Sequence, residues 1–238
     1  MPDSTAPDPR LAVTIEAIRA AAKRLNGRVD RTEMRHSRAL SEATSAEVWV
    51  KYENDQYTAA FKERGALNKL LQLTDNEKQR GVIAASAGNH AQALAHHARE
   101  LGVPTTIVMP KATPNVKVEQ TRARGAVIVL EGETFDDAYA HALKLREQQN
   151  LVFVHPFNDI EVMIGQGTAA IEMLEDAPDL DMLVIPIGGG GLIAGMSVAA
   201  RAIKPEIRII GVEASMYPSF NARMKGEPVK ARSKERRV

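Results

Sequence analysis

The sequence predicts an α/β fold built around parallel β-sheet. Short segments that are apolar throughout recur along the chain, for example residues 105–110 and 182–187. Between them lie longer segments whose apolar residues recur at helical spacing, as Ala91, Leu94 and Ala98 do. Two of the apolar segments also run directly into glycine-containing turns. Strands that are apolar on both sides are typical of a parallel sheet covered by helices on both faces, and we expect that arrangement here.

The first third of the chain predicts three elements. Residues 11–25 ("LAVTIEAIRAAAKRL") have helical spacing of their apolar side chains. Residues 47–52 ("EVWVKY") are a short strand candidate. Residues 66–73 ("ALNKLLQL") are helix-like and follow Lys62, a lysine behind a phenylalanine and ahead of a charged pair.

From residue 81 onward, strands and helices alternate regularly. Apolar runs predict strands at 81–86, 105–110, 126–130, 151–155, 182–187 and 207–213. Helical spacing predicts the segments between them to be helices, at 91–101, 116–124, 135–149, 162–174 and 192–203.

Composition narrows the possible functions. The 238 residues are 44% hydrophobic and 26% charged, which is an ordinary globular balance. The formal net charge of +1 gives no overall basic field that would recruit nucleic acid. The chain has no cysteine, so disulfides, thiolate catalysis and zinc–thiolate sites are excluded. The first ten residues lack the apolar core of a signal peptide, and no run of about 18 apolar residues predicts a membrane span. We therefore expect a soluble cytoplasmic protein.

Four successive glycines follow the predicted strand at 182–187. Without side chains, Gly188 to Gly191 let several backbone N–H groups approach one oxyanion at the start of a helix, and a phosphate is the expected guest. A flexible turn with tight helix packing is the structural alternative. The pattern Gly189-x-Gly191-x-x-Ala194 also matches a dinucleotide-binding fingerprint, with Glu213 placed as a ribose-binding acid.

The second turn is "SAGNHAQAL", residues 86–94. Ser86, Asn89 and His90 are polar groups at a strand end and a helix start, a position that suits an anionic substrate group such as a carboxylate. Simple helix capping by Ser or Asn is the alternative. We expect the neighbouring pair His96-His97 to lie on the surface. The remaining histidines, His36, His141 and His155, show no metal-ligand spacing, and we predict no metal site.

Three stretches together resemble a known family. They are "FKERGALNKL", "SAGNHAQALAHHARELGVPTTIVMPKATPNVKVE" and "GQGTAAIEMLEDAPDLDMLVIPIGGGGLIAG". They are similar to the threonine dehydratases (threonine ammonia-lyases) and serine racemase, which are pyridoxal-phosphate enzymes of fold type II, the fold of the tryptophan synthase β subunit. The resemblance runs in order from about residue 12 to about residue 230.

The resemblance implies a role for each motif. Lys62 is the lysine that binds pyridoxal phosphate covalently, and the apolar Phe61 beside it suits a lysine that must be partly desolvated to react. Asn89 contacts the ring hydroxyl of the cofactor. The remaining assignments are the cofactor phosphate at Gly188, Gly189, Gly190, Gly191 and Leu192, and the substrate carboxylate at Ser86, Ala87, Gly88, Asn89 and His90.

The implied reaction is β-elimination of water from a hydroxy amino acid. L-Threonine would give 2-oxobutanoate and ammonia, and L-serine would give pyruvate, in threonine catabolism or isoleucine biosynthesis. Serine racemase and 3-hydroxyaspartate ammonia-lyase are the alternatives within the family. The dinucleotide interpretation explains neither Lys62 nor the turn at 86–90. The family also implies a homo-oligomer in the full-length form.

The family fold implies two α/β domains with the cofactor between them. The larger would comprise residues 1–80 and 159–238, and the smaller, residues 81–158, would be inserted into it. The basic tail "KARSKERRV" (230–238) does not resemble the family continuation, so we expect a larger domain that lacks its C-terminal part. Such a chain is expected to be poorly stable or inactive alone, and an inactive fragment that serves as a binding or regulatory partner is the non-enzymatic alternative.

The sequence departs from the family pattern at three further places. Ala59-Ala60 stands where the family has Gly-Ser before the Phe-Lys pair, so a hydroxyl near the cofactor is lost. Thr32-Glu33-Met34 replaces a Thr-Pro-Leu near the first strand. Some members bind a divalent cation through a glutamate matching Glu213 and an acid at the position of Ser219. A hydroxyl there lacks the charge that a hard cation needs, so this site is expected to be weak or absent.

Overall fold

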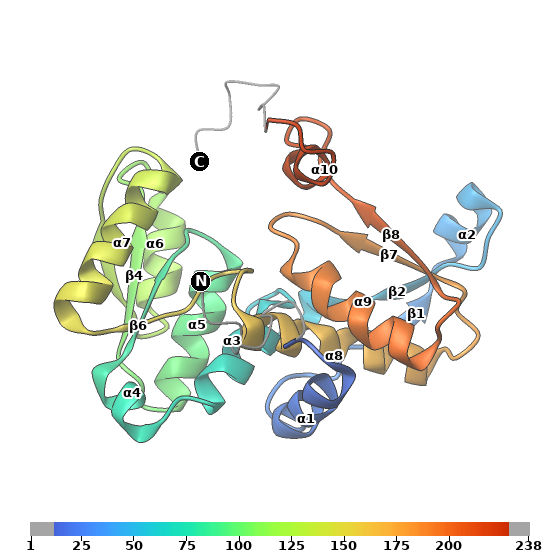
Figure 1. Cartoon of the computed structure of the whole chain (residues 1–238), viewed down its shortest axis with the longest axis horizontal. Coiled ribbons are helices and arrows are strands. Elements are labelled where there is room, and N and C mark those ends of the chain that lie inside the picture. The colour runs from blue at the N-terminus through green and yellow to red at the C-terminus, as the bar shows by residue number, and fades with distance from the viewer. Residues whose placement is uncertain (1–11, 229–238) are drawn as a thin grey trace, which may run out of the picture.

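The computed structural model describes residues 12–228, in which helices and strands alternate along the chain (Figure 1). The helices are α1 (Ile15–Leu25), α2 (Arg38–Thr44), α3 (Lys62–Leu71), α4 (Asp75–Arg80), α5 (Asn89–Glu100), α6 (Asn115–Arg122), α7 (Phe135–Gln149), α8 (Ile160–Asp176), α9 (Gly191–Ile203) and α10 (Ser219–Met224). The strands are β1 (Met34–His36), β2 (Trp49–Lys51), β3 (Val82–Ala85), β4 (Thr105–Met109), β5 (Val127–Leu130), β6 (Val152–Phe153), β7 (Met182–Pro186) and β8 (Arg208–Val212). A short 3-10 turn, η2 (Glu53–Asp55), precedes α3.

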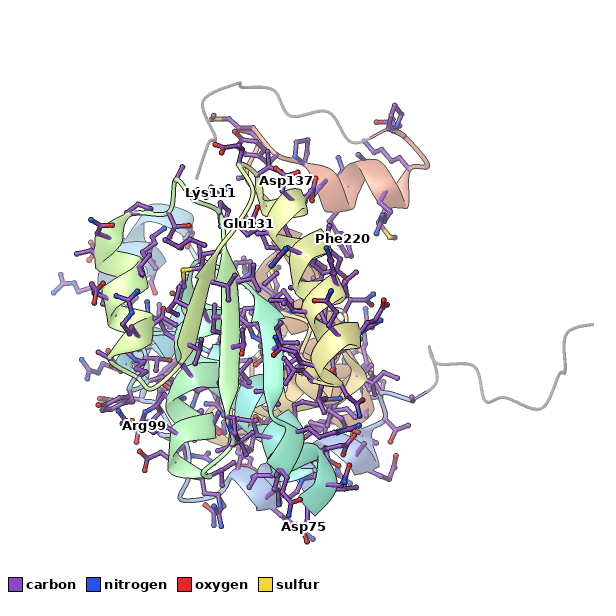
Figure 2. All side chains as sticks on the ribbon, turned by 90° about the vertical axis from the view of Figure 1, so that its left-hand side faces the viewer. Asp75, Arg99, Lys111, Glu131, Asp137 and Phe220 are labelled. Carbon is purple, nitrogen blue, oxygen red and sulfur yellow. The ribbon has the colours of Figure 1, made fainter. Side chains whose placement is uncertain are left out.

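Four parallel strands form one sheet in the order β5-β4-β3-β6. Alternate side chains of β3 point to opposite faces, so Val82 and Ala84 pack with α5 while Ile83 and Ala85 pack with α7. In Figure 2 this sheet stands between α6 and α7. The two covered faces explain why β3 is apolar at every position, as the sequence predicted.

The parallel pair β7–β8 is covered on one face only within residues 12–228. Leu183 and Ile185 are buried in a core cluster with residues of α1, α8 and α9. On the other face, the side chains of Val184, Ile210 and Val212 are 62%, 39% and 51% exposed. Cover on both faces, which the sequence predicts for parallel sheet in general, is thus absent from this pair within the described residues, whereas the four-stranded sheet has it.

Helix α3 lies between α5 and α8 and packs against both. Helices α3 and α8 come close together because each has a glycine where they cross. A Cβ on Gly65 would lie 2.6 Å from the carbonyl oxygen of Val162, and one on Gly165 would lie 2.5 Å from that of Arg64. Backbone meets backbone at this crossing, so the position of α3 on α8 is fixed within narrow limits.

Most of the predicted elements are present, with shifted ends. Helix α1 begins at Ile15 because the Thr14 hydroxyl accepts a hydrogen bond from the N–H of Ala17. Helix α3 begins at Lys62, four residues before the predicted start, and α8 is longer than predicted at both ends. The predicted strand around Trp49 pairs antiparallel with β1, which the sequence did not predict, and α2, α4 and α10 were also missed. The predicted features of residues 1–11 and 230–238 lie outside the described residues.

The close crossing of α8 and α9 requires a glycine at position 195, and this requirement can be tested. A Cβ there would lie 2.1 Å from the carbonyl oxygen of Met163, so Gly195→Ala must push the helices apart. We expect a loss of about 1–3 kcal/mol in the free energy of unfolding, although alanine is the better helix former by about 1 kcal/mol. Urea unfolding measures this loss. Ser197→Ala on the same helix is the control, and equal stability of the two variants would contradict the packing argument.

Candidate active site

Lys62 is the first residue of α3, and its amine lies in a desolvated position. The side-chain Nζ donates a hydrogen bond to the carbonyl oxygen of Pro156 at 2.5 Å, and it lies 5.2 Å from the ring centre of Phe61. Burial disfavours the ammonium form and lowers the pKa of Lys62 to about 8. About a tenth of this amine is therefore neutral, and nucleophilic, at pH 7, against less than about a thousandth of an ordinary lysine.

The two charged residues after Lys62 are buried anchors of α3. Glu63 accepts hydrogen bonds from Nε2 of His97 on α5, at 3.1 Å, and from the backbone N–H of Thr58. Burial acts to raise the pKa of Glu63, but these hydrogen bonds outweigh it and the pKa is lowered. His97 is only 4% exposed, so the prediction that His96-His97 lie on the surface is wrong for His97. Its partner Glu63 explains why a histidine is buried there.

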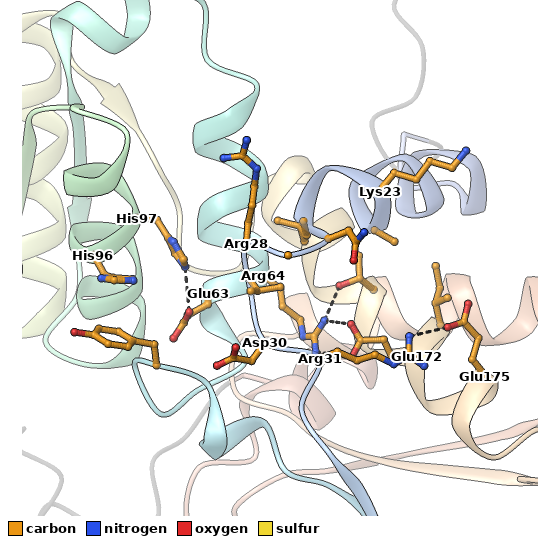
Figure 3. Close-up of a pocket in the computed structure, with 18 residues that line it drawn as sticks. Lys23, Arg28, Asp30, Arg31, Glu63, Arg64, His96, His97, Glu172 and Glu175 are labelled. Atoms are coloured by element: carbon orange, nitrogen blue, oxygen red, sulfur yellow. Dashed lines mark hydrogen bonds and ion pairs between the residues drawn. The ribbon is translucent and has the colours of Figure 1, made fainter.

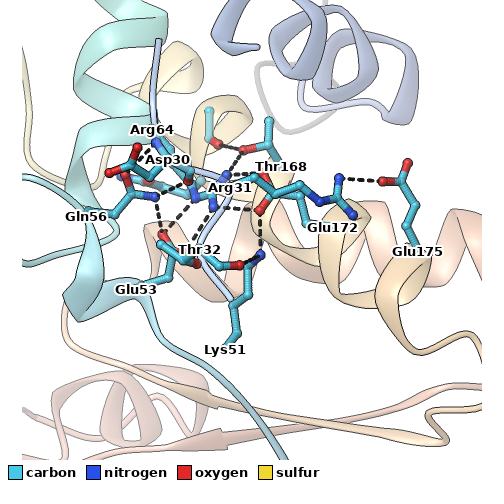
Figure 4. A network of polar contacts seen from close by, with 12 residues as sticks. Asp30, Arg31, Thr32, Lys51, Glu53, Gln56, Arg64, Thr168, Glu172 and Glu175 are labelled. Atoms are coloured by element: carbon cyan, nitrogen blue, oxygen red, sulfur yellow. Dashed lines mark hydrogen bonds and ion pairs between the residues drawn. The ribbon is translucent and has the colours of Figure 1, made fainter. Parts of the chain in front are cut away.

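Arg64 is fully buried, and its guanidinium is completely paired (Figure 4). Nε and Nη2 bind the two carboxylate oxygens of Glu53, both at 2.7 Å. Nη1 and Nη2 bind Glu172 on α8 at 2.6 and 2.8 Å, and Nη1 also reaches the Thr168 hydroxyl at 3.2 Å. All five N–H donors of an arginine are thus used. Lys51 of β2 adds a 2.6 Å contact to Glu172, so the network ties α3 to α8 and to the first strands.

A cavity of about 700 Å³ lies beside this anchored turn (Figure 3). Glu63, Arg64 and His97 contribute to its wall, and the rings of Tyr57 and His96 stack beside it at 4.3 Å. Lys62 does not line the cavity. The amine of Lys62 is therefore not part of the wall of this cavity.

The turn after β3 presents free backbone N–H groups. Gly88 occupies the position before α5, and no side chain caps this helix. The Ser86 hydroxyl accepts a hydrogen bond from the N–H of Gly88 at 3.3 Å, and the Asn89 side chain is exposed. Within the described residues, the N–H groups of Ala87, Asn89 and His90 have no acceptor. This helix start suits an anion, and the alternative of simple side-chain capping does not apply.

His90, also in this turn, is buried and held neutral. Its Nε2 lies 3.0 Å from the carbonyl oxygen of Val154, to which only an N–H can donate, so Nδ1 is unprotonated. Nδ1 is buried and has no partner among the described residues. Burial, and to a lesser extent the charge of nearby Lys62, lower the pKa of His90 to about 3. A neutral imidazole adds no positive charge to the surroundings of the amine.

The glycine turn between β7 and α9 also presents free N–H groups. The first bonded amide of α9 is that of Ala194, which donates to the carbonyl oxygen of Gly190 at 3.0 Å. Within residues 12–228, none of the six N–H groups from Gly188 to Ile193 has an acceptor. Gly188 and Gly189 are exposed, and a Cβ on Gly188 would meet open space. The turn therefore has the free donors and the room that an oxyanion needs.

A four-residue segment after β6, Val154 to Phe157, connects these parts. Val154 holds His90 of the first turn, and Pro156 holds the amine of Lys62. Phe157 packs on the glycine turn, since a Cβ on Gly189 would lie 2.1 Å from its ring. The start of α5, the amine of Lys62 and the glycine turn are thus assembled around one stretch of backbone.

Comparison with known proteins places the chain in a family. The family model of pyridoxal-phosphate dependent enzymes matches residues 25–238, and the chain belongs to this family. It is 48% identical over 213 residues to L-threonine ammonia-lyase of Thermotoga maritima, covering 90% of this chain and 53% of the relative. Against the catabolic L-threonine dehydratase TdcB of Escherichia coli K12, identity is 46%, with 89% and 66% covered. The chain thus spans about half to two thirds of the length of these relatives.

Solved structures agree with this fold. Maize serine racemase superposes with a TM-score of 0.87 at 34% identity, covering 92% of this chain and 67% of the other. Threonine deaminase isoform 2 of Solanum lycopersicum gives a TM-score of 0.85 at 36% identity, covering 97% and 63%. The predicted fold class, and membership of a pyridoxal-phosphate enzyme family, are confirmed.

The part of the chain that the structure describes shows neither a metal-binding cluster nor a membrane-spanning helix. Within residues 12–228, no cluster of three or more His, Cys, Asp or Glu side chains is arranged to hold a metal ion. No helix in the same range has the length and apolar character needed to cross a membrane.

Sequence reasoning missed the residues that hold the site in place. It singled out Lys62 and both turns, which the structure brings together around residues 154–157. It treated Glu63 and Arg64 only as a charged pair and gave no role to Pro156 or Phe157. The sequence did contain one signal of their burial. Glu63 and Arg64 stand directly before Gly-Ala-Leu in a segment with a helical, apolar pattern. Two adjacent charged side chains in such a segment indicate buried ion pairs more than contact with solvent.

The low pKa of Lys62 makes a prediction about stability. In the folded chain, burial lowers the pKa of the Lys62 amine to about 8. In the unfolded chain the amine has the ordinary pKa of a lysine. The resulting destabilisation is complete below pH 8 and absent above the unfolded value of about 10.4. Without cofactor, Lys62→Met is therefore expected to be more stable than the parent chain by about 1–3 kcal/mol at pH 7.

This difference should shrink as the pH rises toward 10. Urea unfolding at pH 7, 8.5 and 10 measures it, with Lys78→Met, a partly exposed lysine on α4, as the control. A stability gain for Lys62→Met that does not depend on pH would argue against a desolvated amine.

Proposed function

We propose that this chain belongs to an enzyme that converts L-threonine to 2-oxobutanoate and ammonia, and also L-serine to pyruvate and ammonia, with pyridoxal phosphate as cofactor. The observation that supports this most directly is the desolvated amine of Lys62, held between two helix starts with free N–H groups. The names of the relatives from Thermotoga maritima and Escherichia coli favour threonine as the substrate.

The donor groups fit the proposed cofactor. The glycine turn, Gly188 to Gly191 with Leu192, has the free N–H groups to hold the cofactor phosphate. Lys62 has the neutral amine needed for a covalent bond to an aldehyde carbon. Asn89 has an exposed amide that could contact a ring hydroxyl, and Phe61 lies beside the amine. We assign these residues to the cofactor.

The substrate carboxylate is assigned to the other turn. The unbonded N–H groups of Ala87, Asn89 and His90 at the start of α5 can donate to its oxygens, with Ser86 and Gly88 completing the turn. Of this turn, His90 lies near enough to the amine of Lys62 for its pKa to be affected by that charge. The 86–90 turn therefore orients the substrate.

The chemistry divides between the cofactor and the chain. When bound, pyridoxal phosphate supplies an electron sink for negative charge at the α-carbon. The amine of Lys62 would accept the α-proton, which its lowered pKa permits near neutral pH. That proton and the β-hydroxyl together would leave as water. Addition of water and loss of ammonia leave the 2-oxo acid, so the net change for threonine is conversion to 2-oxobutanoate and ammonia.

The remaining assignments belong to the same proposal. The larger domain comprises residues 1–80 and 159–238 and the smaller one residues 81–158; all strands of the four-stranded sheet come from the latter range, which supports this division. The full-length protein is a cytoplasmic homo-oligomer. Its divalent-cation site is weak, since Ser219 contributes only a hydroxyl beside Glu213.

The first test concerns the covalent anchor. Lys62→Ala is expected to lose the visible absorbance of lysine-bound pyridoxal phosphate and its trapping by borohydride, because no amine remains at Pro156. Threonine deamination, followed as 2-oxobutanoate, should fall to background. Lys78→Ala is the control and should keep all three signals.

Borohydride linkage of the cofactor to the Lys62→Ala variant would show that another lysine is the anchor. If the parent chain binds the cofactor but releases no 2-oxobutanoate from threonine, the chain acts as an inactive binding partner, the non-enzymatic alternative.

The second test separates dehydration from racemisation. Racemisation needs a second acid/base group on the opposite face of the substrate. By resemblance, serine racemase has a serine at the position of Ala87, and the methyl group of Ala87 cannot move a proton. With L-serine we therefore expect pyruvate to form far faster than D-serine. Ala87→Ser should raise the share of D-serine, measured by chiral chromatography of the products. Formation of D-serine by the parent chain at rates comparable to pyruvate would favour serine racemase instead.

A further inference from the structure

Glu213 directly follows β8, and its carboxylate is bound to the start of α10. One oxygen accepts hydrogen bonds from the N–H of Phe220 at 2.6 Å and from the Ser219 hydroxyl at 3.2 Å. The other accepts from the N–H of Asn221 at 3.0 Å. Partial burial acts to raise the pKa of Glu213, but these hydrogen bonds lower it overall. The carboxylate thus ties the end of β8 to a helix that follows six residues later.

This tie places the ring of Phe220 on the glycine turn. A Cβ on Gly190 would lie 2.8 Å from Cε2 and 3.2 Å from Cδ2 of that ring. Gly190 also has a φ of +91°, in the left-handed region that favours glycine. The ring therefore occupies the space that any side chain at position 190 would need.

Phe157 packs on the same turn from a different part of the chain. Cβ atoms on Gly189 and Gly191 would lie 2.1 Å from its ring and 2.7 Å from its carbonyl oxygen, respectively. Successive glycines have no side chains to order them and lose more conformational entropy on folding than other residues. The order of this turn must then come from the groups packed around it, and the two phenylalanines are such groups. Gly188 stays open, which leaves room for an anion.

We propose that Glu213 is a positioning residue for the phosphate-binding turn. It holds α10 so that Phe220 packs on Gly190, and this fixes the free N–H groups of the turn before an anion arrives. The inference rests on the proposed role of that turn in binding the phosphate of pyridoxal phosphate. It gives Glu213 a function that requires neither a cation nor contact with the cofactor.

The first experiment needs no cofactor. Hydrogen exchange of the 238-residue chain reports on the Ala194 amide, which is bonded to the carbonyl oxygen of Gly190. Glu213→Ala and Phe220→Ala should each speed its exchange by about tenfold. The first variant loses the charge-assisted hydrogen bonds that hold α10, and the second loses the ring that these bonds place on Gly190. Glu213→Gln keeps an acceptor oxygen and should give a smaller increase. Met224→Ala, at the 75% exposed far end of α10, is the matched control.

The second experiment compares two ligands. Titration with pyridoxal phosphate should show about tenfold weaker binding to Glu213→Ala and Phe220→Ala, since the phosphate-binding N–H groups are less ordered. Pyridoxal, which lacks the phosphate, should bind these variants and the parent chain equally. A general loss of structure would weaken both ligands, so the difference between them isolates the turn.

Each outcome is decisive. Unchanged Ala194 exchange in both alanine variants, or equal loss of pyridoxal and pyridoxal phosphate binding, would overturn the positioning role. If Glu213→Ala does not fold, Phe220→Ala carries the same test alone. Faster Ala194 exchange in the two alanine variants, found together with a parent chain that binds pyridoxal and pyridoxal phosphate equally well, would support the role of Glu213 and reject the phosphate assignment, so the two proposals fail separately.

Discussion

The buried guanidinium of Arg64 is the constraint on which the site depends. It has both carboxylate oxygens of Glu53 on one side and those of Glu172 on the other. A buried charge pair of this kind adds little net stability, but removing one partner costs about 3–5 kcal/mol, so it strongly disfavours alternative positions of α3. Lys62 is two residues away on the same helical turn, so the network that fixes Arg64 also fixes the position of Lys62. The reactive amine is therefore positioned by residues that never touch it.

Close backbone packing adds to that constraint. Gly65 and Gly165 let α3 and α8 meet without intervening side chains, and Gly167 and Gly195 do the same for α8 and α9. Because both helices pack closely on α8, this helix fixes the positions of the lysine at the start of α3 and of the glycine turn at the start of α9. A rigid central helix explains how groups more than a hundred residues apart in sequence can share one site.

Sequence reasoning succeeded where local signals and burial agreed. Helix α7 was predicted from helical spacing with its true ends, and in the structure Thr134 and Asp137 form a capping box that fixes its start. β1 and α2 were missed because neither has a buried residue, so no periodic apolar pattern marks them. The glycine turn and the Ser86 turn were visible as local motifs. His97, which pairs with Glu63, and Glu172, which pairs with Arg64, were not, since they lie 34 and 108 residues away.

In the order Lys62-Glu63-Arg64, a carboxylate stands directly beside an amine whose pKa is lowered, and the fold keeps the two groups apart. A carboxylate close to the amine would favour the ammonium form and raise its pKa, which would leave little neutral amine near pH 7. Glu63 is adjacent in sequence, but successive helical residues point in directions about 100° apart, and its carboxylate is turned toward His97 and Thr58. Lys62 is left with an uncharged carbonyl as its hydrogen-bond partner. The buried His97 pair thus keeps an unavoidable negative charge away from the amine, and this is the physical reason for burying a histidine on α5.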